Sequence, residues 1–445
     1  MIKVFYVLIL LLTLSACAIN KRNGVRVVSE SHKTIPAYTA ASVKYKLNGK
    51  ADLNVKIGNP VVVSVATRPE KWGFFQFPTI GRMPDGSLLA KWNMAADAIE
   101  SYGNHNHGSA VSSDGGIHWK VQSITEFSTG LLLPNGDRIA VNTPKPIKAE
   151  DLNLPKPIGT RAETYPRKAI YTFYKMDDLP ESRQGIYLNR LRKGKSDWKT
   201  EKVNLYDPHA ARYELNGLVP ILWWGDMHVA SDGSIIAGIY PGFYIQDDGQ
   251  VIPKDAIFFY RSTDNGHSWK IQGRILYTPD LKADGAGNER MGFMEPAFEI
   301  LADGTYICVM RTSDGKGDGP LYISRSWDKG VSWSKPEALT SAGVLPQLLE
   351  LDNGMIALSA GRPGVQLRFS ADKGQSWTDP FEMMPYGEKQ KNNISWYDHV
   401  SCGYTGLLAT GTDRFLIIYS DFRHLNHQNE FRNAIKVREV IVKPN

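Results

Sequence analysis

His105 and His107 stand two residues apart in the segment Tyr102-Gly-Asn-His-Asn-His-Gly108. Residues at i and i+2 of an extended chain face the same side, so both imidazoles are expected to point into one space. Histidine titrates near neutral pH and can accept or donate a proton in catalysis. Two other interpretations stay open: a metal pair, for which no third or fourth ligand stands nearby, and histidines of a surface loop.

A repeated pattern, Ser-x-Asp-x-Gly-x-x-Trp, predicts the elements that must position such residues. Its four copies begin at Ser112, Ser262, Ser326 and Ser370. In each copy Asp can bond to its own backbone, Gly can adopt a positive φ, and Trp can pack back on the turn. A repeated rigid hairpin implies a repeated small sheet, which indicates an all-β protein of the β-propeller type with Asp-box hairpins.

A second series of tight turns, most of them Asp-Gly or Asn-Gly, predicts the inner hairpin of each blade. These turns lie at 84–86, 134–136, 231–233, 302–304, 352–354 and 410–412. The series predicts six blades, or seven if the long stretch 126–215 contains another. The last blade has no box after 434–442, so residues 55–65 are expected to supply its missing strand and close the ring.

The inner strands of a propeller surround a channel, and substrates bind where these strands begin. Counting back about eight residues from each inner turn predicts the positions at this mouth: Gln76 with Phe77, Phe127, Trp224, Glu295, Leu345 and Tyr404. Aromatic residues and one carboxylate are typical of a sugar platform, although core filling is the alternative for Phe77 and Phe127. His228, on the inner strand of the third blade, is a candidate for the channel or for the core.

The N-terminus is a separate unit. Lys3 precedes an apolar run at 4–12 that is too short to span a bilayer, and the run leads into Leu14-Ser-Ala-Cys17. This segment resembles the lipobox of bacterial lipoproteins, which implies removal of 1–16, lipid attachment at Cys17 and export to the outer membrane. A plain secretion signal is the alternative. Residues 17–50 are expected to form a tether and leading segment, and 51–445 the catalytic propeller.

Several mouth positions resemble those of sialidases. That family opens its first blade with Arg-Ile-Pro, carries Glu-Pro followed by an Arg, and has Gly-Tyr-Ser in its last blade. The matching positions here are Gln76-Phe-Pro, Glu295-Pro with Arg311, and Gly-Tyr404-Thr, and Arg362 stands where another family Arg would come. Gln76 replaces the first of three arginines, and a neutral amide cannot grip a carboxylate as a charged fork does. The sequence has no clear match to the family's acid/base Asp.

A second resemblance is to the β-propeller ulvan lyases and a related uronic-acid oligosaccharide dehydratase. Their active constellation is a His, a Tyr on a strand of the next blade and an Arg on the following strand; His107, Tyr174 and Arg190 occur in that order. By this resemblance Arg190 neutralises a uronic-acid carboxylate, while either His107 or Tyr174 acts as the base and the other donates a proton to the leaving oxygen. Tyr174 then needs a nearby cation such as Arg190 to act as a base. A further His of the lyases has no counterpart at 127–129.

The sequence therefore predicts a lipid-anchored carbon-oxygen lyase that acts by β-elimination on a uronic acid in an acidic, sulfated polysaccharide or its oligosaccharides. The remaining candidates, for substrate binding, are His105, Gln76, Trp224, His228, Glu295, Arg311 and Tyr404. An excess of 52 Lys and Arg over 46 Asp and Glu suits an anionic substrate. No cofactor, zinc or nucleic-acid motif is present, and a structural ion stays open. The alternatives are an exo-sialidase or other propeller glycosidase, and a non-catalytic glycan-binding lipoprotein.

Overall fold

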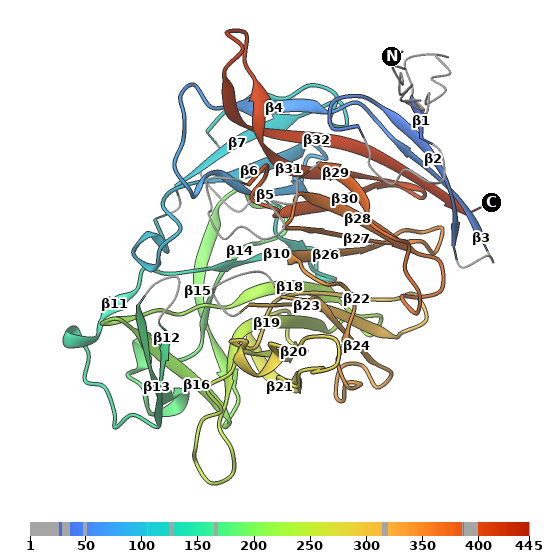
Figure 1. The fold of residues 1–445 in the computed structure, drawn as a ribbon. Helices are drawn as coiled ribbons and strands as arrows, with labels where there is room; N and C mark the ends of the chain where they lie inside the picture. The colour runs from blue at the N-terminus through green and yellow to red at the C-terminus, as the bar shows by residue number, and fades with distance from the viewer. Residues whose placement is uncertain are drawn as a thin grey trace, which may run out of the picture.

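The structure is a computed structural model that describes residues 26–28, 36–47, 51–104, 106–123, 129–163, 168–313, 319–384, 386 and 399–444. Its secondary structure is almost entirely β-strand (Figure 1). In the described ranges, antiparallel ladders group most strands into six four-stranded sets, each beginning at an inner strand. This is the all-β propeller architecture that the repeats predict. No helix of these ranges is long and apolar enough to cross a membrane.

Three of the sets are separate four-stranded sheets, each formed by consecutive strands. From the inner to the outer strand, they are β5 (Phe74–Arg82), β6 (Leu88–Met94), β7 (His107–Ser112) and β8 (Lys120–Val121); β22 (Phe293–Ile300), β23 (Tyr306–Thr312), β24 (Tyr322–Ser326) and β25 (Glu337–Ala338); and β26 (Val344–Glu350), β27 (Ile356–Gly361), β28 (Val365–Ser370) and β29 (Phe381–Met384). The inner hairpins of all three sets contain the predicted turns.

The other three sets belong to larger sheets. They are β9 (Leu131–Leu132), β10 (Arg138–Asn142), β14 (Ile186–Leu191) and β15 (Trp198–Tyr206); β18 (Trp224–Val229), β19 (Ile235–Tyr244), β20 (Ala256–Ser262) and β21 (Ser268–Ile275); and β30 (Thr405–Gly411), β31 (Arg414–Leu425), β32 (Phe431–Pro444) and β4 (Val61–Val65). The last set combines strands from the two ends of the chain.

The ring closes as the sequence predicts, because β4 pairs with β32 and brings Val65 opposite Ala434. β32 also pairs with β3 (Ala51–Ile57), which continues through β2 (Ala41–Leu47) to β1 (Arg26–Val28). Arg438 of β32 is fully buried and holds this leading segment. Its guanidinium donates to the carbonyl oxygens of Pro36, Thr39 and Gly58 at 2.9, 2.7 and 2.9 Å.

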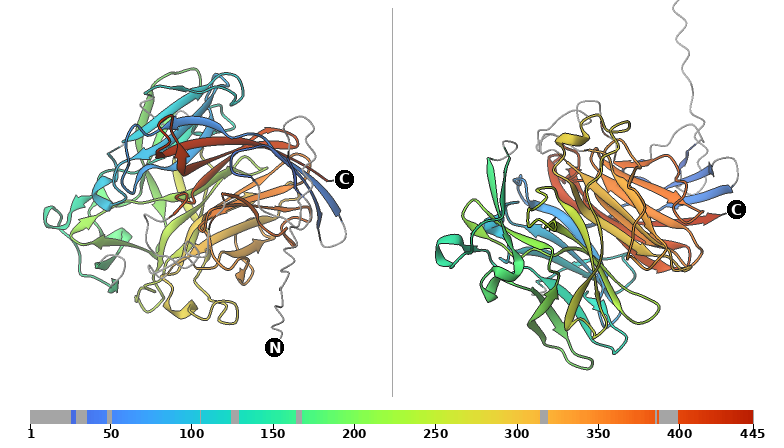
Figure 2. Two further views of the ribbon diagram at one scale, coloured as in Figure 1. Left: turned by 45° about the horizontal axis from the view of Figure 1, so that its top comes forward. Right: turned by 90° about the horizontal axis from the view of Figure 1, so that it is seen from below.

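An added sheet accounts for the length of the 126–215 stretch. Its strands are β11 (Ile147–Lys148), β12 (Gly159–Glu163), β13 (Ala169–Lys175), β16 (Ala210–Leu215) and β17 (Leu218–Val219). It joins the end of β19, where Ala210 pairs with Tyr244, and it lies on the opposite side of the molecule from β1–β3 (Figure 2). Five short 3-10 helices lie in connections of the described ranges: η1 (Ile99–Ser101), η2 (Ala149–Asp151), η3 (Met176–Asp178), η4 (Glu181–Arg183) and η5 (Gly287–Glu289).

The four Asp boxes form the rigid turns that their sequence predicts. In the third box, Ser326 is the last residue of β24; its hydroxyl donates to Asp328 and accepts the Gly330 N–H, both at 2.8 Å. Gly330 has a φ of 86°, and the Trp333 indole donates to its carbonyl at 3.2 Å. The boxes at Ser112, Ser262 and Ser370 repeat the two serine hydrogen bonds. Each box therefore fixes the end of a third strand.

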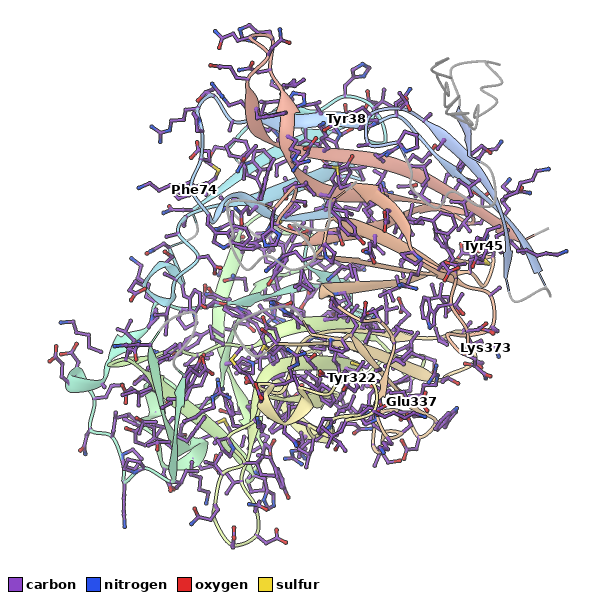
Figure 3. The ribbon with its side chains drawn as sticks, in the orientation of Figure 1. Tyr38, Tyr45, Phe74, Tyr322, Glu337 and Lys373 are labelled. Carbon is purple, nitrogen blue, oxygen red and sulfur yellow. The ribbon has the colours of Figure 1, made fainter. Side chains whose placement is uncertain are left out.

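The blades have two distinct ends. Inner strands run from the channel mouth toward the inner hairpins, and third strands run in the same direction toward the Asp boxes. The mouth and the boxes consequently lie at opposite ends of every blade. Figure 3 shows this separation: Phe74 begins β5 on the left, whereas Lys373 of the fourth box and Glu337, which follows the third box, lie on the right.

Candidate functional site at the channel mouth

Three inner strands share an irregular backbone at the mouth. Phe77, Glu295 and Leu345 have φ values of 52°, 46° and 33°, and a proline follows each of them. At the same points the ladders of β5, β22 and β26 shift register. A positive φ is unfavourable for residues other than glycine, and bulges of this kind re-aim side chains next to binding sites. These positions are the ones predicted by counting back from the turns.

Glu295 is the centre of a buried network. Its Oε1 accepts hydrogen bonds from Arg311 Nη1 at 2.9 Å and from the Tyr404 hydroxyl. Arg311 Nη1 also lies 3.4 Å from Tyr404 Oη, and Glu295 Oε2 accepts the Leu345 N–H at 2.8 Å. The network brings together β22, β23, β26 and the start of β30. Three residues predicted at the mouth, Glu295, Arg311 and Tyr404, therefore form one cluster.

The electrostatics of this cluster keep the phenol protonated in the resting protein. Burial, followed by the Glu295 carboxylate, raises the pKa of Tyr404 well above its usual range. Arg311 and Arg362 act in the opposite direction by stabilising the phenolate. The phenol proton therefore stays on a hydroxyl that donates to a carboxylate, which is the arrangement of a nucleophile with an adjacent base.

Arg362 and an aromatic wall complete one side of the cluster. The guanidinium carbon of Arg362 lies 5.8 Å from the Tyr404 ring centroid and 5.5 Å from that of Trp72. Arg362 Nε donates to the Cys402 carbonyl at 2.9 Å. The Trp72 indole in turn donates to Asp97 Oδ2 at 3.1 Å. Asp97 is exposed, so one indole ring connects a solvent-accessible carboxylate with the arginine beside Tyr404.

A second aromatic group lies on the other side. The Trp224 ring packs edge to face with Tyr102 at 4.9 Å between centroids and lies 5.9 Å from Tyr240. Its indole N–H donates to Thr143 Oγ1 at 3.2 Å. Burial, followed by Glu295 and Tyr404, raises the pKa of Tyr240, so this phenol lies within electrostatic reach of the cluster.

Deeper in the channel, acidic side chains join neighbouring inner strands. Asp226 accepts the Phe298 N–H at 3.3 Å, and Glu299 accepts the Glu350 N–H at 3.4 Å. Burial raises the pKa of Asp226 to about 6 and that of Glu299 to about 7. His228 Nδ1 lies 3.4 Å from Glu299 Oε1, and burial lowers its pKa. His228 therefore lies in the channel wall, four residues beyond Trp224.

The predicted trio of His107, Tyr174 and Arg190 does not converge. His107 begins β7 and lies at the mouth end of its blade, whereas Arg190 is the penultimate residue of β14 and lies at the Asp-box end. The Arg190 side chain has no exposed surface; its Nε donates to Glu201 at 2.8 Å and its Nη1 to the carbonyl of Asn265, in the second box, at 2.9 Å. The prediction that Arg190 grips a substrate carboxylate is therefore wrong.

Tyr174 also differs from its predicted environment. It belongs to β13 of the added sheet, pairs with Arg212 and is only 5% exposed. The proposed base needs a cation that lowers its pKa, but burial, followed by Glu214, raises the pKa of this phenol. Tyr174 is therefore a poor base at neutral pH.

The remaining predicted residues are placed as follows. Gln76 is 1% exposed, and its Oε1 has no hydrogen-bond partner among the described residues. The Phe77 ring packs on Tyr404 at 4.8 Å. His105, Phe127 and Cys17 lie outside the described residues. No cluster of three or more His, Cys, Asp or Glu in the described ranges is arranged to hold a metal ion.

Sequence reasoning missed Asp97, Tyr102 and Tyr240. Asp97 and Tyr102 lie in the connection between β6 and β7, a few residues before the His105 and His107 pair. Tyr240 lies on a second strand, opposite Trp224, so counting along inner strands could not find it. The pairing register between β18 and β19, which brings Tyr240 opposite Trp224, would have been needed to predict this residue.

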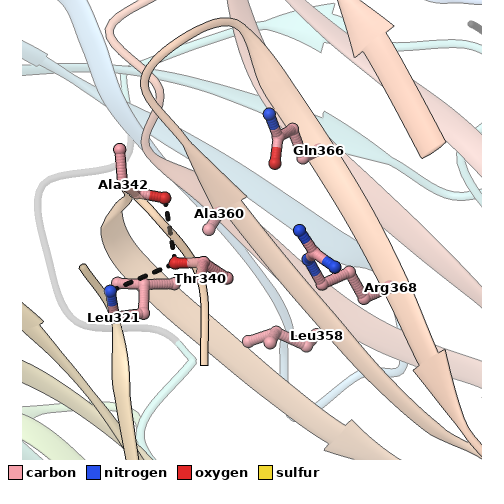
Figure 4. Close-up of a pocket in the computed structure, with 7 residues that line it drawn as sticks. All are labelled: Leu321, Thr340, Ala342, Leu358, Ala360, Gln366 and Arg368. Atoms are coloured by element: carbon pink, nitrogen blue, oxygen red, sulfur yellow. Dashed lines mark hydrogen bonds between the residues drawn. The ribbon is translucent and has the colours of Figure 1, made fainter. Parts of the chain in front are cut away.

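A small pocket lies away from this site, between the β22–β25 and β26–β29 sets. Its lining residues are Leu321, Thr340, Ala342, Leu358, Ala360, Gln366 and Arg368 (Figure 4). Thr340 Oγ1 accepts the Leu321 N–H at 3.1 Å and donates to the Ala342 carbonyl at 3.0 Å. These hydrogen bonds satisfy the polar backbone of a connection between the two sets and give the pocket a structural role.

The fold has relatives among solved structures. A protein of unknown function from Dyadobacter fermentans has 18% identity and a TM-score of 0.52, over 87% of this chain and 99% of that chain. An α-L-arabinanase of Penicillium chrysogenum, complexed with arabinobiose, has 18% identity and a TM-score of 0.46, over 86% and 98%. The NanB sialidase of Streptococcus pneumoniae has 13% identity and a TM-score of 0.44, over 86% and 70%.

At such identities the similarity to the Dyadobacter structure concerns the fold alone. No curated protein sequence matches the chain. The family model described as BNR repeat-like domain matches residues 165–404, which is more than half of the 445 residues. The match includes three of the four Asp boxes and ends at Tyr404. The chain therefore belongs to the BNR repeat-like domain family.

Proposed function

We propose that the protein is a retaining glycoside hydrolase in which Tyr404 is the nucleophile and Glu295 its base. The observation that carries this proposal is the hydrogen bond from the Tyr404 hydroxyl to Glu295 Oε1, with Arg311 Nη1 on the same oxygen. A weak nucleophile is activated in this way by an adjacent base that a third group orients. The propeller fold and the position at the channel mouth agree with a carbohydrate substrate.

The reaction follows from the hydrogen bonds. The Tyr404 oxygen forms a bond to the anomeric carbon while its proton passes to Glu295, and the bond to the leaving oxygen breaks. Because burial raises the pKa of Tyr404, proton transfer accompanies attack and does not precede it. A water molecule then attacks the glycosyl-tyrosine, and Glu295 returns the proton to the phenol oxygen. Two displacements at one carbon retain the anomeric configuration.

Asp97 is our candidate for the acid that protonates the leaving oxygen and later deprotonates the water. Its carboxylate is exposed and accepts the Trp72 indole N–H at 3.1 Å. Trp72 lies against Phe77, which packs on Tyr404, with ring centroids 6.3 and 4.8 Å apart. Two aromatic rings therefore connect this exposed titratable group with the Tyr404 phenol.

The charge balance favours an acidic sugar. Arg311 and Arg362 both lie close to Tyr404, while Glu295 is the carboxylate, among the described residues, that hydrogen-bonds to its phenol. A protonated phenol approaches an anionic sugar without the repulsion that a carboxylate nucleophile would meet. Glycosides of carboxylated sugars are therefore the first substrates to test, with α-L-arabinofuranosides as the neutral comparison.

The elimination predicted from sequence uses related groups and needs its own test. A lyase of that type requires an ionised phenol or a neutral imidazole as base, together with a free cation on the carboxylate. Arg190 is unavailable for the second task, because its side chain is enclosed at the Asp-box end. Hydrolysis does not require a phenolate at rest, and we therefore favour it.

The experiment compares three reactions of the purified protein. Fluorogenic sialosides and α-L-arabinofuranosides report hydrolysis, and the absorbance of unsaturated uronate formed from ulvan or its oligosaccharides reports elimination. NMR of the first product determines the anomeric configuration. We expect hydrolysis with retention, and a Tyr404→Phe variant that has lost at least about 1,000-fold in kcat.

Three outcomes would contradict the proposal. Inversion at the anomeric carbon would remove Tyr404 as nucleophile. Formation of unsaturated uronate without hydrolysis would restore the lyase. Binding of glycans without turnover of any substrate would indicate a binding protein.

A further inference from the structure

The added sheet supports the aromatic group at the mouth. Trp224 and Tyr102 pack against the hydrophobic cluster that contains Phe173, Tyr213 and Phe243 of β13, β16 and β19. Thr143, whose hydroxyl accepts the indole N–H, lies in the connection that leads from β10 into this sheet. Trp224 is therefore held by the cluster that joins the added sheet to β19 and by the connection that leads into this sheet.

The resulting surface is rigid and still accessible. Trp224, Tyr102 and Tyr240 are each partly exposed, although their rings contact one another. Among the described residues, the Tyr240 hydroxyl has no hydrogen-bond partner. A fixed indole with a nearby available hydroxyl offers a sugar both an apolar face and a polar contact.

Its place relative to the reacting groups is also defined. Glu295 and Tyr404 are, after burial, the largest causes of the raised pKa of Tyr240. Tyr102 shares the connection between β6 and β7 with Asp97.

Trp224 begins β18, and Glu295 lies near the start of β22. These inner strands are neighbours, because Asp226 of β18 accepts the Phe298 N–H of β22. The aromatic surface therefore lies beside the strand that carries Glu295.

We infer that Trp224, Tyr102 and Tyr240 form a second sugar subsite, which binds the residue adjacent to the one that reacts at Tyr404. This inference rests on the proposed function and refines its substrate class: the substrate is a glycan of at least two sugar residues, not a single sugar with a small leaving group. The added sheet serves to build this subsite. Trp224 supplies the stacking face, and Thr143 is a positioning residue that acts through the indole.

The test measures binding to the Tyr404→Phe protein, so that turnover does not interfere. An array of immobilised mono-, di-, tri- and tetrasaccharides, which includes sialosides, uronates and arabinosides, identifies the ligand. Isothermal titration then compares that oligosaccharide with its terminal monosaccharide. We expect the oligosaccharide to bind at least about 10-fold more tightly.

Substitutions assign the difference to the subsite. Trp224→Ala should lower oligosaccharide affinity about 10-fold and leave monosaccharide affinity within about twofold, while Trp224→Phe retains most of the affinity. Thr143→Val and Tyr240→Phe should have smaller effects in the same direction. Trp327→Ala is the matched control, because Trp327 is 70% exposed in the third Asp box, at the opposite end of the blade. Thermal unfolding verifies that each variant is folded.

Three results would contradict the inferred subsite. Equal affinity for the oligosaccharide and its monosaccharide, an unchanged oligosaccharide affinity in folded Trp224→Ala protein, or no binding of any saccharide longer than one residue would overturn the inference. The proposed function can fail separately: wild-type protein that binds oligosaccharides through Trp224 but hydrolyses none keeps the subsite and loses the hydrolase.

Discussion

Arg190 and Arg311 are both buried arginines that face a glutamate, yet they lie at opposite ends of the blades. Arg190 has no exposed side-chain surface and joins Glu201 to the backbone of the second Asp box. Arg311 keeps 11% of its side chain exposed and binds a carboxylate that also accepts a hydrogen bond from the Tyr404 phenol. Arg190 is thus enclosed between turns at the box end, whereas Arg311 shares its carboxylate partner with the Tyr404 hydroxyl at the mouth. Residue type and burial do not distinguish these two arginines. The direction of the strand that carries each one determines whether it lies at the mouth or at the Asp boxes.

The largest expected effect is at the mouth. Glu295→Gln should lower kcat by about 100- to 10,000-fold, because the phenol of Tyr404 loses its proton acceptor. If the amide oxygen keeps the Leu345 N–H, the amide nitrogen faces Arg311 and Tyr404, so the variant should also lose stability and its kcat is compared per folded molecule. Steady-state kinetics on the best substrate measure this effect, and Glu337→Gln, on a side chain that is 75% exposed, is the matched control. A variant that keeps more than a tenth of its activity would remove Glu295 from the mechanism.

At the box end, we expect a substitution to lower the stability of the protein and to leave its catalytic activity unchanged. Arg190→Met removes the donor of the Asn265 carbonyl and the closest cation of Glu201, and it should cost about 3 kcal/mol in the free energy of unfolding. Urea denaturation measures this loss. Arg192→Met is the control, because the Arg192 side chain pairs with the same acids but is 52% exposed, and its loss should cost at most about 1 kcal/mol. Activity per folded molecule should be unchanged in both. A catalytic defect in folded Arg190→Met protein would return Arg190 to the site.

The titratable side chains of the channel wall, between these two ends, should make the free energy of unfolding depend on pH. Burial raises the pKa of Glu299 to about 7, so the folded state holds this proton more tightly than the unfolded state does. The corresponding stability is fully present below about pH 4.5 and is lost as the pH rises through 7; it amounts to at most about 3 kcal/mol. Asp226, with a pKa raised to about 6, acts in the same sense, whereas the lowered pKa of His228 acts in the opposite sense.

Urea midpoints between pH 5 and pH 8.5 measure this dependence. Glu299→Gln should flatten the decline and make the protein more stable than the wild type at alkaline pH. A variant whose midpoints decline as steeply as those of the wild type would show that Glu299 does not carry the dependence.

The smallest expected effect is at a single Asp box. Asp328→Ala removes the acceptor of the Ser326 and Ser332 hydrogen bonds and should cost about 1 kcal/mol of stability. Asp247→Ala, at an exposed turn, is the control and should have almost no effect. Asp328 has its pKa lowered to about 2, so its contribution should disappear only as the pH falls from about 4 toward 2. Loss of activity without loss of stability would contradict a purely structural role for the box.

The sequence predicted the architecture because local chemistry determines it. Asp boxes, inner turns and the β4 closure depend on short patterns, and all of them occupy their expected places. Counting back from the turns also found Glu295 and Tyr404, because their inner strands β22 and β30 are similar in length, with 8 and 7 residues. The same count placed Phe77 and Leu345 at equivalent backbone positions, where the bulge recurs.

The trio failed for a physical reason. Spacing along the chain placed Tyr174 and Arg190 on successive strands, but it did not reveal that β13 joins an added sheet or that β14 carries Arg190 toward the boxes. The contact between Trp72 and Asp97 depends on side chains from separate connections, which no periodicity records. Residues that meet only through tertiary packing are the ones that sequence patterns miss.

The pairing of β4 with β32 has a consequence for how the chain reaches this fold. Val65 and Ala434 are partners although almost the entire polypeptide separates them. Bringing distant segments together costs chain entropy before any contact rewards it, and folds of high contact order form slowly. The ring can therefore close only after the final strand has been synthesised, and until then β31 keeps an unpaired edge that neighbouring molecules can join.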